Sequence, residues 1–171
     1  RVPLKMTKKP AHKGSYSTPV EQDPFKVSLK DKLDFLSAID AQLKEDWIYK
    51  RYIYADFQKK NIYFFNSEGT EVERHLSNVF AKMMIMALDG DGQMQRRSQE
   101  LFTTGKGSRG YEMLTNPELF SSHAGRIKDE LAQLIKADPL EYGRRSVILL
   151  PGQGFLQVHE TIGHPLELDR I

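Results

Sequence analysis

The stretch WIYKRYIYA, residues 47–55, combines aromatic and β-branched side chains in a pattern with a period of two residues. That period is typical of a β-strand, in which successive side chains point to opposite faces of a sheet. Residues typical of turns, at 59–61, 66–69 and 89–92, divide the sequence that follows. They predict an antiparallel meander of about five strands, the later ones over 62–65, 71–76, 78–88 and 93–102.

Helical periodicity appears on both sides of this meander. Ser28 is a suitable N-cap, and apolar residues spaced three and four apart predict a helix over 28–45. A second helix is predicted to start at Asn116–Pro117 and to end at Asp138–Pro139. The apolar run SVILL, residues 146–150, predicts a short strand buried on both faces. The sequence therefore predicts an α+β fold, a mostly antiparallel meander sheet covered by helices.

The composition excludes several classes of protein. A chain of 171 residues with 28% charged and 39% hydrophobic residues is typical of one water-soluble domain. It contains no cysteine, which excludes disulfides and thiolate metal ligands within the chain. Its strongly apolar runs are far shorter than the roughly 20 residues that span a bilayer, so we expect a cytoplasmic protein without a membrane partner.

Residues 1–24 differ from the rest of the chain, because they are rich in Lys, Pro, Gly and Ser and are basic up to the first acidic residue, Glu21. An irregular basic segment is expected here, followed by an α+β domain over residues 25–171. A contact with nucleic acid is the alternative, but one loosely spaced run of basic residues is weak evidence, so no nucleic-acid partner is expected. The chain has no initiator methionine and stops within an amphipathic stretch. We therefore expect an incomplete domain of a larger protein.

Two glycine motifs favour structural interpretations. GKGSRG, residues 105–110, fits the letters of a dinucleotide-binding loop, but no helix is predicted to start at it, so a flexible loop is expected. DGDG, residues 89–92, resembles the start of a calcium loop, but Met94 occupies the position of the required glycine. A hairpin turn is expected there instead. His75 and His123 are expected to be structural or surface residues.

The sequence VHETIGHPLELD, residues 158–169, contains the strongest candidate for a chemical site. Two histidines that flank a glutamate are the residue types of a hydrolytic zinc site. His159 and His164 are five residues apart, however, which directs their side chains about 140° apart on a regular helix. Either a π-type bulge brings them to one face, or the helix ends at Gly163 and Pro165 holds His164 in extended backbone. A surface helix with two unrelated histidines is the alternative.

The wider segment LLPGQGFLQVHETIGHPLELD, residues 149–169, resembles the metalloprotease signature of the TldD/PmbA family, also called modulators of DNA gyrase. Other landmarks of that family are similar and occur in the same order: PVEQDPF at 19–25, NSEG at 66–69 and GSRGYEML at 107–114. The resemblance extends from about residue 19 to the end of the chain. It implies the N-terminal domain of a catalytic, TldD-like zinc metallopeptidase whose C-terminal domain is absent.

By this resemblance, His159 and His164 are zinc ligands, and Glu160 activates a zinc-bound water for attack on a peptide carbonyl. Two further carboxylates match the family pattern as supporting, second-shell or structural groups, Glu167 and Asp169. Pro165 departs from the pattern, in which glycine is common at this position. The family's third zinc ligand is a cysteine of the C-terminal domain, which this chain lacks. The chain alone is therefore expected to be inactive and to bind metal weakly or not at all.

The resemblance also implies partners. The expected substrate is an unfolded or extended peptide inside the cell, and the expected partner is a second TldD/PmbA-family subunit, in a homo- or hetero-dimer. A non-catalytic peptide-binding or assembly module of the same fold is the alternative function.

Overall fold

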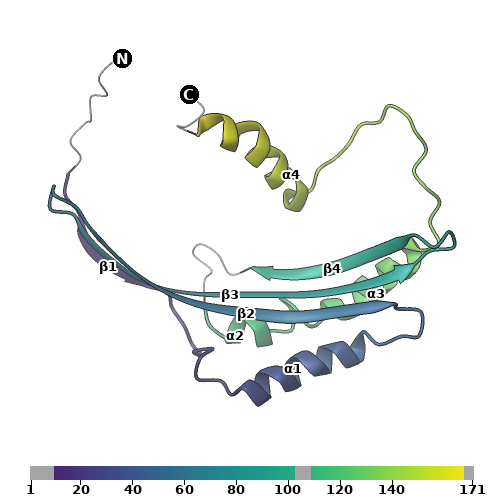
Figure 1. Ribbon diagram of the computed structural model, residues 1–171, viewed down its shortest axis with the longest axis horizontal. Coiled ribbons are helices and arrows are strands. Elements are labelled where there is room, and N and C mark those ends of the chain that lie inside the picture. Colours follow the sequence, from purple (N-terminus) through teal and green to yellow (C-terminus); the bar gives the residue numbers. More distant parts are fainter. Residues whose placement is uncertain (1–9, 103–108, 168–171) are drawn as a thin grey trace. The chain divides into compact units, whose positions relative to one another are not determined.

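The computed structural model describes residues 10–102 and 109–167, in two compact units divided between Ala137 and Asp138. The first unit is a four-stranded sheet with helices on one of its faces (Figure 1). This arrangement confirms the predicted α+β fold with a mostly antiparallel sheet. In chain order its elements are β1 (Lys13–Ser17), α1 (Leu29–Gln42), β2 (Lys50–Phe65), β3 (Glu71–Leu88), β4 (Met94–Phe102), α2 (Glu112–Thr115) and α3 (His123–Leu134).

The central strand of the sheet is β3. Antiparallel pairing with β2 runs along nearly its whole length, from Lys50 opposite Met86 to Phe65 opposite Glu71. The other edge of β3 is shared, because β1 pairs with its first residues in parallel and β4 pairs with its last residues antiparallel. The strand β2 therefore forms one complete edge of the sheet.

The structure corrects the number and length of the predicted strands. The predicted turn at 59–61 is wrong, because Lys59, Lys60 and Asn61 continue β2 opposite β3. The predicted division of β3 between 76 and 78 is wrong as well. At 59–61 the polar residues lie in solvent, and a strand with an exposed face accepts them without bending. At the second place Ser77 is buried and continues β3 opposite Lys59. The chain reverses at 66–69, where Gly69 has a φ of 88°, and again in the predicted hairpin at 89–92.

Residues 13–17 correct the expectation of an irregular N-terminal segment, because they form β1. The sequence KGSYS has no apolar alternation and all five residues are exposed. Its position depends on main-chain pairing with β3 and on the next residue, Thr18, which is buried. The N–H of Thr18 donates to the carbonyl of His75, and its hydroxyl accepts from the N–H of Ser77. No side-chain pattern in the sequence could have indicated this strand.

The two helices predicted for this unit are present as α1 and α3 with different limits, and the four-residue helix α2 was not predicted. The N-cap of α1 is Ser28, whose hydroxyl accepts from the N–H of Asp31 at 3.1 Å, as predicted. The second predicted helix starts later than expected, at His123. Residues 117–122 form turns instead, in which the fully buried side chain of Phe120 anchors the chain.

The core lies between the sheet and the helices. Alternate residues of β3 are fully buried on the helical face, from Val79 to Ala87, while the residues between them are only half-buried on the other face. The helical side of the core consists of Ile39, Leu43, Leu114, Phe120, Ala124, Ile127 and Leu131. The period of two in the strands and the spacing of three and four in the helices therefore converge on one apolar layer.

Glu112 connects two distant segments beneath the sheet. Its carboxylate accepts from the backbone N–H groups of Gly110 at 2.8 Å, Gln22 at 2.9 Å and Glu21 at 3.4 Å. Burial alone would raise the pKa of Glu112, but these N–H groups outweigh it and lower the pKa below its ordinary value of 4.5. The two segments pass so closely that a Cβ on Gly110 would lie 2.2 Å from the carbonyl oxygen of Gln22.

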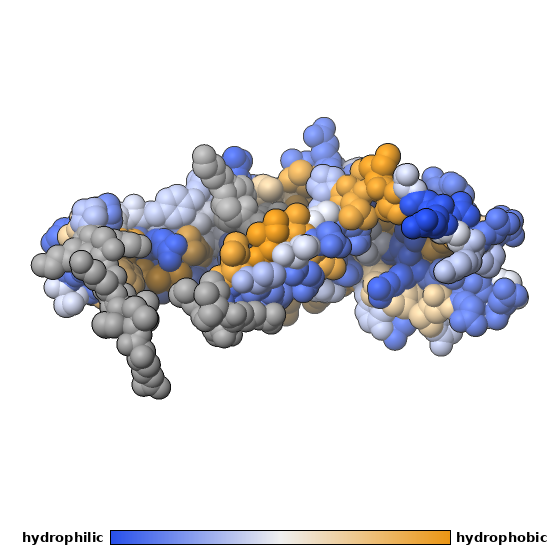
Figure 2. All heavy atoms as spheres, turned by 90° about the horizontal axis from the view of Figure 1, so that it is seen from above, coloured by the Kyte–Doolittle hydropathy of each residue, from blue (hydrophilic) through white to orange (hydrophobic). Residues whose placement is uncertain are grey.

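The second unit contains three short helical elements and a long extended segment. These elements are α4 (Pro151–Val158), a π-helix η2 (His159–Gly163) and a 3₁₀ turn η3 (His164–Leu166). The strand predicted over 146–150 is wrong: these residues are extended but unpaired, and Ile148 is 90% exposed. A strand needs a neighbour for its main chain, and none of the described residues of this unit supplies one. Val147, Ile148, Leu149 and Leu150 are exposed, and Figure 2 shows that apolar residues gather at places on the molecular surface.

Among the described residues, no helix is both long enough and apolar enough to cross a membrane.

Candidate metal centre

The five-residue spacing of the two histidines is accommodated by a change of helix type. The helix α4 starts with Pro151 at its first turn, where the missing N–H costs nothing, and runs as a regular α-helix to Val158. From His159 the backbone hydrogen bonds span five residues instead of four. The N–H of His164 donates to the carbonyl of His159, five residues earlier. Such i to i+5 turns are rare and are frequent at functional sites.

Of the two routes that the sequence left open, the structure therefore has the π-type bulge. The other route required a helix end at Gly163 and extended backbone at His164. Both residues are helical instead, with φ and ψ of −59° and −62° at Gly163 and of −63° and −40° at His164. Pro165 occupies the first turn of η3, and the chain becomes extended only at Glu167.

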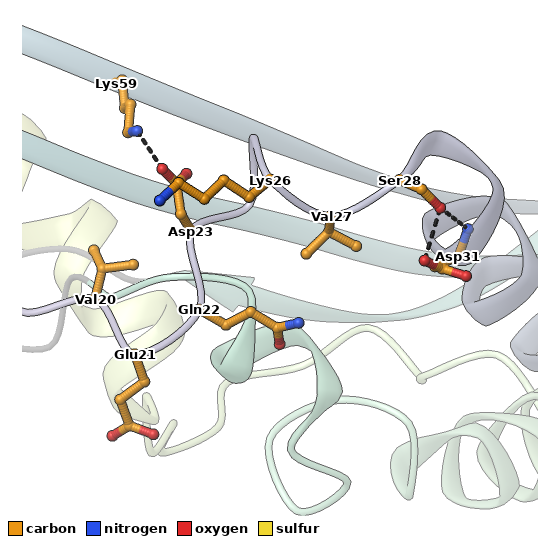
Figure 3. Close-up of a pocket in the computed structure, with 9 residues that line it drawn as sticks. All are labelled: Val20, Glu21, Gln22, Asp23, Lys26, Val27, Ser28, Asp31 and Lys59. Atoms are coloured by element: carbon orange, nitrogen blue, oxygen red, sulfur yellow. Dashed lines mark hydrogen bonds and ion pairs between the residues drawn. The ribbon is translucent and has the colours of Figure 1, made fainter.

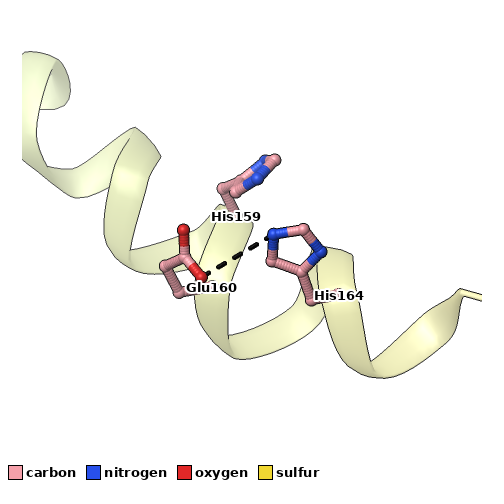
Figure 4. A group of neighbouring side chains, drawn as sticks. All are labelled: His159, Glu160 and His164. Atoms are coloured by element: carbon pink, nitrogen blue, oxygen red, sulfur yellow. Dashed lines mark ion pairs between the residues drawn. The ribbon is translucent and has the colours of Figure 1, made fainter. Parts of the chain in front are cut away.

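The π-turn brings the two imidazole rings together (Figure 4). The ring centroids of His159 and His164 are 4.5 Å apart, and the ring planes meet at 78°. Glu160 lies beside them, with its Oε2 3.8 Å from Nε2 of His164. The potential ligand atoms of these three residues all lie within 4.8 Å of one another. His159 and Glu160 are exposed and His164 is half-buried, so the group is open to a ligand from outside.

A fourth residue holds one of the rings. Oε1 of Glu167 lies 2.8 Å from Nδ1 of His164, three residues earlier. With Nδ1 as the donor to this carboxylate, Nε2 of His164 keeps its lone pair and points to the side of Glu160. A carboxylate behind a ligating imidazole commonly fixes the ring's tautomer and orientation in this manner. The position of Glu167 is thus the one that a supporting carboxylate requires.

The donor set fits zinc. Imidazole nitrogen and carboxylate oxygen are both common zinc ligands, and two ligands of a tetrahedral ion at 2.0–2.1 Å lie about 3.4 Å apart. Because the three donors are already within 4.8 Å, rotations of exposed side chains are sufficient to close this distance. With Glu160 as a proton acceptor instead of a ligand, two nitrogen ligands remain, fewer than the three that catalytic zinc sites take from the protein.

The other residues with possible chemistry lie elsewhere. Asp169 and most of the glycine loop at 105–110 fall outside the described residues. His75 is on β3, where its ring nitrogens contact Asn61 and Glu73, and His123 begins α3, so both have structural surroundings.

A cavity of about 710 Å³ in the first unit lies between the segment before α1 and the strand β2 (Figure 3). Two hydrogen bonds join residues of its lining: Lys59 donates to Asp23 at 2.6 Å, and Ser28 donates to Asp31 at 2.7 Å. The hydrogen bond from Lys59 lowers the pKa of Asp23 below its ordinary value. These pairs stabilise the path of the chain into α1, and the cavity lacks the histidines of a hydrolytic centre.

Comparison with known families gives a match to most of the first compact unit. The family model described as the PmbA/TldA metallopeptidase central domain matches residues 22–137. The chain belongs to the PmbA/TldD family. The match ends where the first compact unit ends, so the histidine motif lies beyond it and the predicted single domain over 25–171 stays a prediction.

Two curated relatives are similar to larger parts of the chain. A protein of Archaeoglobus fulgidus named metalloprotease is 25% identical over 161 residues, which are 94% of this chain and 36% of that protein. A protein of Methanothermobacter thermautotrophicus with the same name is 31% identical over 120 residues, which are 69% of this chain and 24% of that protein. The chain thus spans about a third or less of the length of these two relatives.

Proposed function

We propose that this chain contributes the His-Glu-His segment of a zinc-dependent peptidase that hydrolyses unfolded or extended peptides in the cytoplasm. The observation that carries the proposal is the π-turn at His159–Gly163. A regular helix would direct His159 and His164 to different sides, whereas this turn places their rings 4.5 Å apart with a carboxylate beside them. Two surface histidines without a shared ligand give no reason for such a turn.

In the proposed reaction, His159 and His164 hold the metal through their ring nitrogens. Zinc, when bound, supplies a Lewis acid that polarises the peptide carbonyl and makes water more acidic. Glu160 takes the proton of the attacking water at a carboxylate oxygen and delivers a proton to the leaving amine. Glu167 keeps Nδ1 of His164 occupied, so that only Nε2 faces the metal.

The third protein ligand comes from a region of the longer protein outside these 171 residues. Catalytic zinc sites take three ligands from the protein, and this chain offers two imidazoles and no cysteine. The relatives named metalloprotease are between about two and a half and three times as long, which leaves ample sequence for another ligand. The chain alone therefore binds zinc weakly and is inactive, and it works together with a second subunit of the family.

The test uses the full-length protein and its Glu160→Gln variant. The amide keeps the size of the carboxylate but cannot accept the proton, so peptide hydrolysis falls by about 10² to 10⁴ while the zinc content is unchanged. Glu141→Gln, which makes the same change at a side chain outside the histidine group, serves as the control and keeps full activity. Equal hydrolysis by the Glu160→Gln variant and the parent protein would refute the assigned role of Glu160.

A non-catalytic peptide-binding or assembly module is the second candidate. It is favoured by the strand β2, a complete sheet edge of 16 residues to which another strand can add. Zinc-dependent hydrolysis by the full-length protein distinguishes the two candidates. A protein that retains peptides but never cleaves them, with zinc bound, supports the module.

A further inference from the structure

We propose that the outer edge of β2 is a dimer interface, through which two copies of this chain pair antiparallel about a two-fold axis at Gln58. The proposal gives a surface to the two-subunit arrangement proposed above, and it does not depend on the zinc site. It joins the two sheets into one continuous sheet across the dimer.

The strand β2 has an unusually complete free edge. It has 16 residues and pairs on one side with β3, and no described strand pairs with its other side. Alternate residues of such an edge direct unpaired N–H and C=O groups outward. Proteins usually protect an edge of this length with a proline, a bulge or a covering segment. β2 contains no proline or glycine and its pairing with β3 has no bulge, so its lysines, Lys50, Lys59 and Lys60, are the only protection of this kind within the strand itself.

A groove follows the first half of this edge. It has a volume of about 360 Å³ and lies between α1 and β2, where Leu33, Leu36 and Ile53 supply its apolar lining. The polar end of the groove is fixed, because Arg51 donates to both carboxylate oxygens of Asp40, at 2.7 and 3.0 Å. This hydrogen-bonded pair lowers the pKa of Asp40 and keeps the guanidinium in one orientation.

The second half of β2 has exposed aromatic side chains, which line a separate pocket of about 340 Å³ with residues of β1 and β3, and the ring of Tyr63 contacts that of His75. Tyr63 is 57% exposed and Phe65 is 67% exposed, and both lie on the same face of β2 as Arg51 and Ile53, since they are separated by even numbers of residues. Groove and aromatic side chains thus occupy opposite ends of one strand. An antiparallel two-fold operation places each end of the strand beside the other end in the second copy.

One register satisfies both ends. A two-fold axis that passes through Gln58 perpendicular to the sheet places residues equally distant from Gln58 in the sequence opposite each other. Ile53 then lies opposite Tyr63 of the second copy, and Arg51 lies opposite Phe65. The aromatic rings of one copy then enter the groove of the other, and Phe65 lies against the guanidinium of Arg51. On the other face, Tyr52 and Phe64, which are 39% and 51% exposed, become neighbours across the interface.

The same register pairs opposite charges. Asp56 lies opposite Lys60, and symmetry makes two such pairs on either side of Gln58. Both side chains are exposed in the single chain, so each pair forms at the surface of the joined sheet. Directly opposed charges of opposite sign stabilise an antiparallel pair, and like charges destabilise it. A second copy is favoured over an arbitrary extended peptide because this complementarity is built into the strand itself.

The first experiment uses the full-length protein, with the parent protein as the background for any cysteine outside these 171 residues, which themselves contain none. Gln58→Cys places one thiol at the two-fold axis, where it faces its own copy, so oxidation links most of the protein into a covalent dimer. The control is Ser98→Cys, an exposed residue of β4 far from this edge, for which cross-linking stays at background. Equal cross-linking of the two variants, or none with Gln58→Cys, overturns the proposal.

The second experiment measures the dimer dissociation constant by sedimentation velocity. Asp56→Lys and Lys60→Asp each create two like-charge pairs and raise this constant about tenfold, and the double variant restores it. A monomer at all concentrations overturns the proposal, as does a dimer that is indifferent to both reversals. A monomer whose Gln58→Cys thiol cross-links to an added unfolded peptide assigns the edge to peptides instead. These measurements do not use hydrolysis, so their failure leaves the proposed peptidase untouched.

Discussion

The imidazole rings of His159 and His164 lie 4.5 Å apart although the residues are separated by five positions in the sequence. The distance follows from the π-turn that joins them, in which the N–H of His164 bonds to the carbonyl of His159. Glu160 and Glu167 complete the surroundings of His164, one on each side of its ring. Because of this backbone geometry, the potential metal-ligand atoms of His159, Glu160 and His164 lie close together despite the five-residue spacing of the histidines.

Glu167 is expected to set the zinc affinity through His164. Glu167→Ala removes the carboxylate that lies 2.8 Å from Nδ1, so the ring loses its fixed tautomer and orientation. The zinc affinity of the full-length protein should fall 10- to 100-fold, as measured by competition with a chromophoric chelator. Glu141→Ala, in the same unit, is the control and should leave the affinity unchanged. An unchanged affinity in the Glu167 variant would remove this residue from the site.

The length of the turn between the histidines should control metal binding. Deletion of Ile162 leaves a spacing of four residues, which places both imidazoles on one face of a regular helix, so zinc binding is retained. Insertion of one alanine after Ile162 makes the spacing six residues and turns the rings about 120° apart, so zinc binding is lost. Zinc content after dialysis measures both outcomes. Retention of zinc by the insertion variant would contradict the shared site.

Glu112 should make the first unit sensitive to acid. Its pKa is lowered in the folded protein by backbone N–H groups, so its contribution is present above about pH 4.5 and is lost as the pH falls through the folded-state pKa. Glu112→Ala should lower the free energy of unfolding by about 2 kcal/mol at pH 7 and by less at pH 3, as measured in urea. Glu118→Ala, at an exposed turn, should show neither effect. An equal loss at both pH values would mean that the charge of Glu112 is irrelevant.

The sequence correctly predicted those strands and helices that have a clear pattern of apolar side chains or a capping residue. The period of two around Tyr52 and the N-cap at Ser28 both correspond to observed elements. Strand lengths were not predictable in this way, because Lys59–Asn61 look like a turn yet continue β2 with their side chains in solvent. β1 was missed because main-chain pairing with β3 defines it, and residues 146–150 were wrongly predicted because an apolar run cannot form a strand without a neighbour.

For the candidate site, the sequence supplied the residues and two alternative backbone geometries, but not the choice between them. The π-turn depends on small differences in hydrogen bonding over His159–Gly163, which no single side chain reveals. The proximity of Glu167 to Nδ1 of His164 follows from the 3₁₀ turn after the π-turn, and the sequence pattern does not indicate that turn either. The roles of these residues in catalysis stay predictions.

The most direct test of the account is X-ray absorption at the zinc edge on the full-length protein and on its His159→Ala and His164→Ala variants. If both imidazoles share one ion, the parent spectrum contains two imidazole ligands from this motif at 2.0–2.1 Å. Each variant then loses one imidazole and most of its bound zinc. A variant that retains zinc with an unchanged imidazole count would contradict the central claim that the π-turn unites His159 and His164 in one metal site.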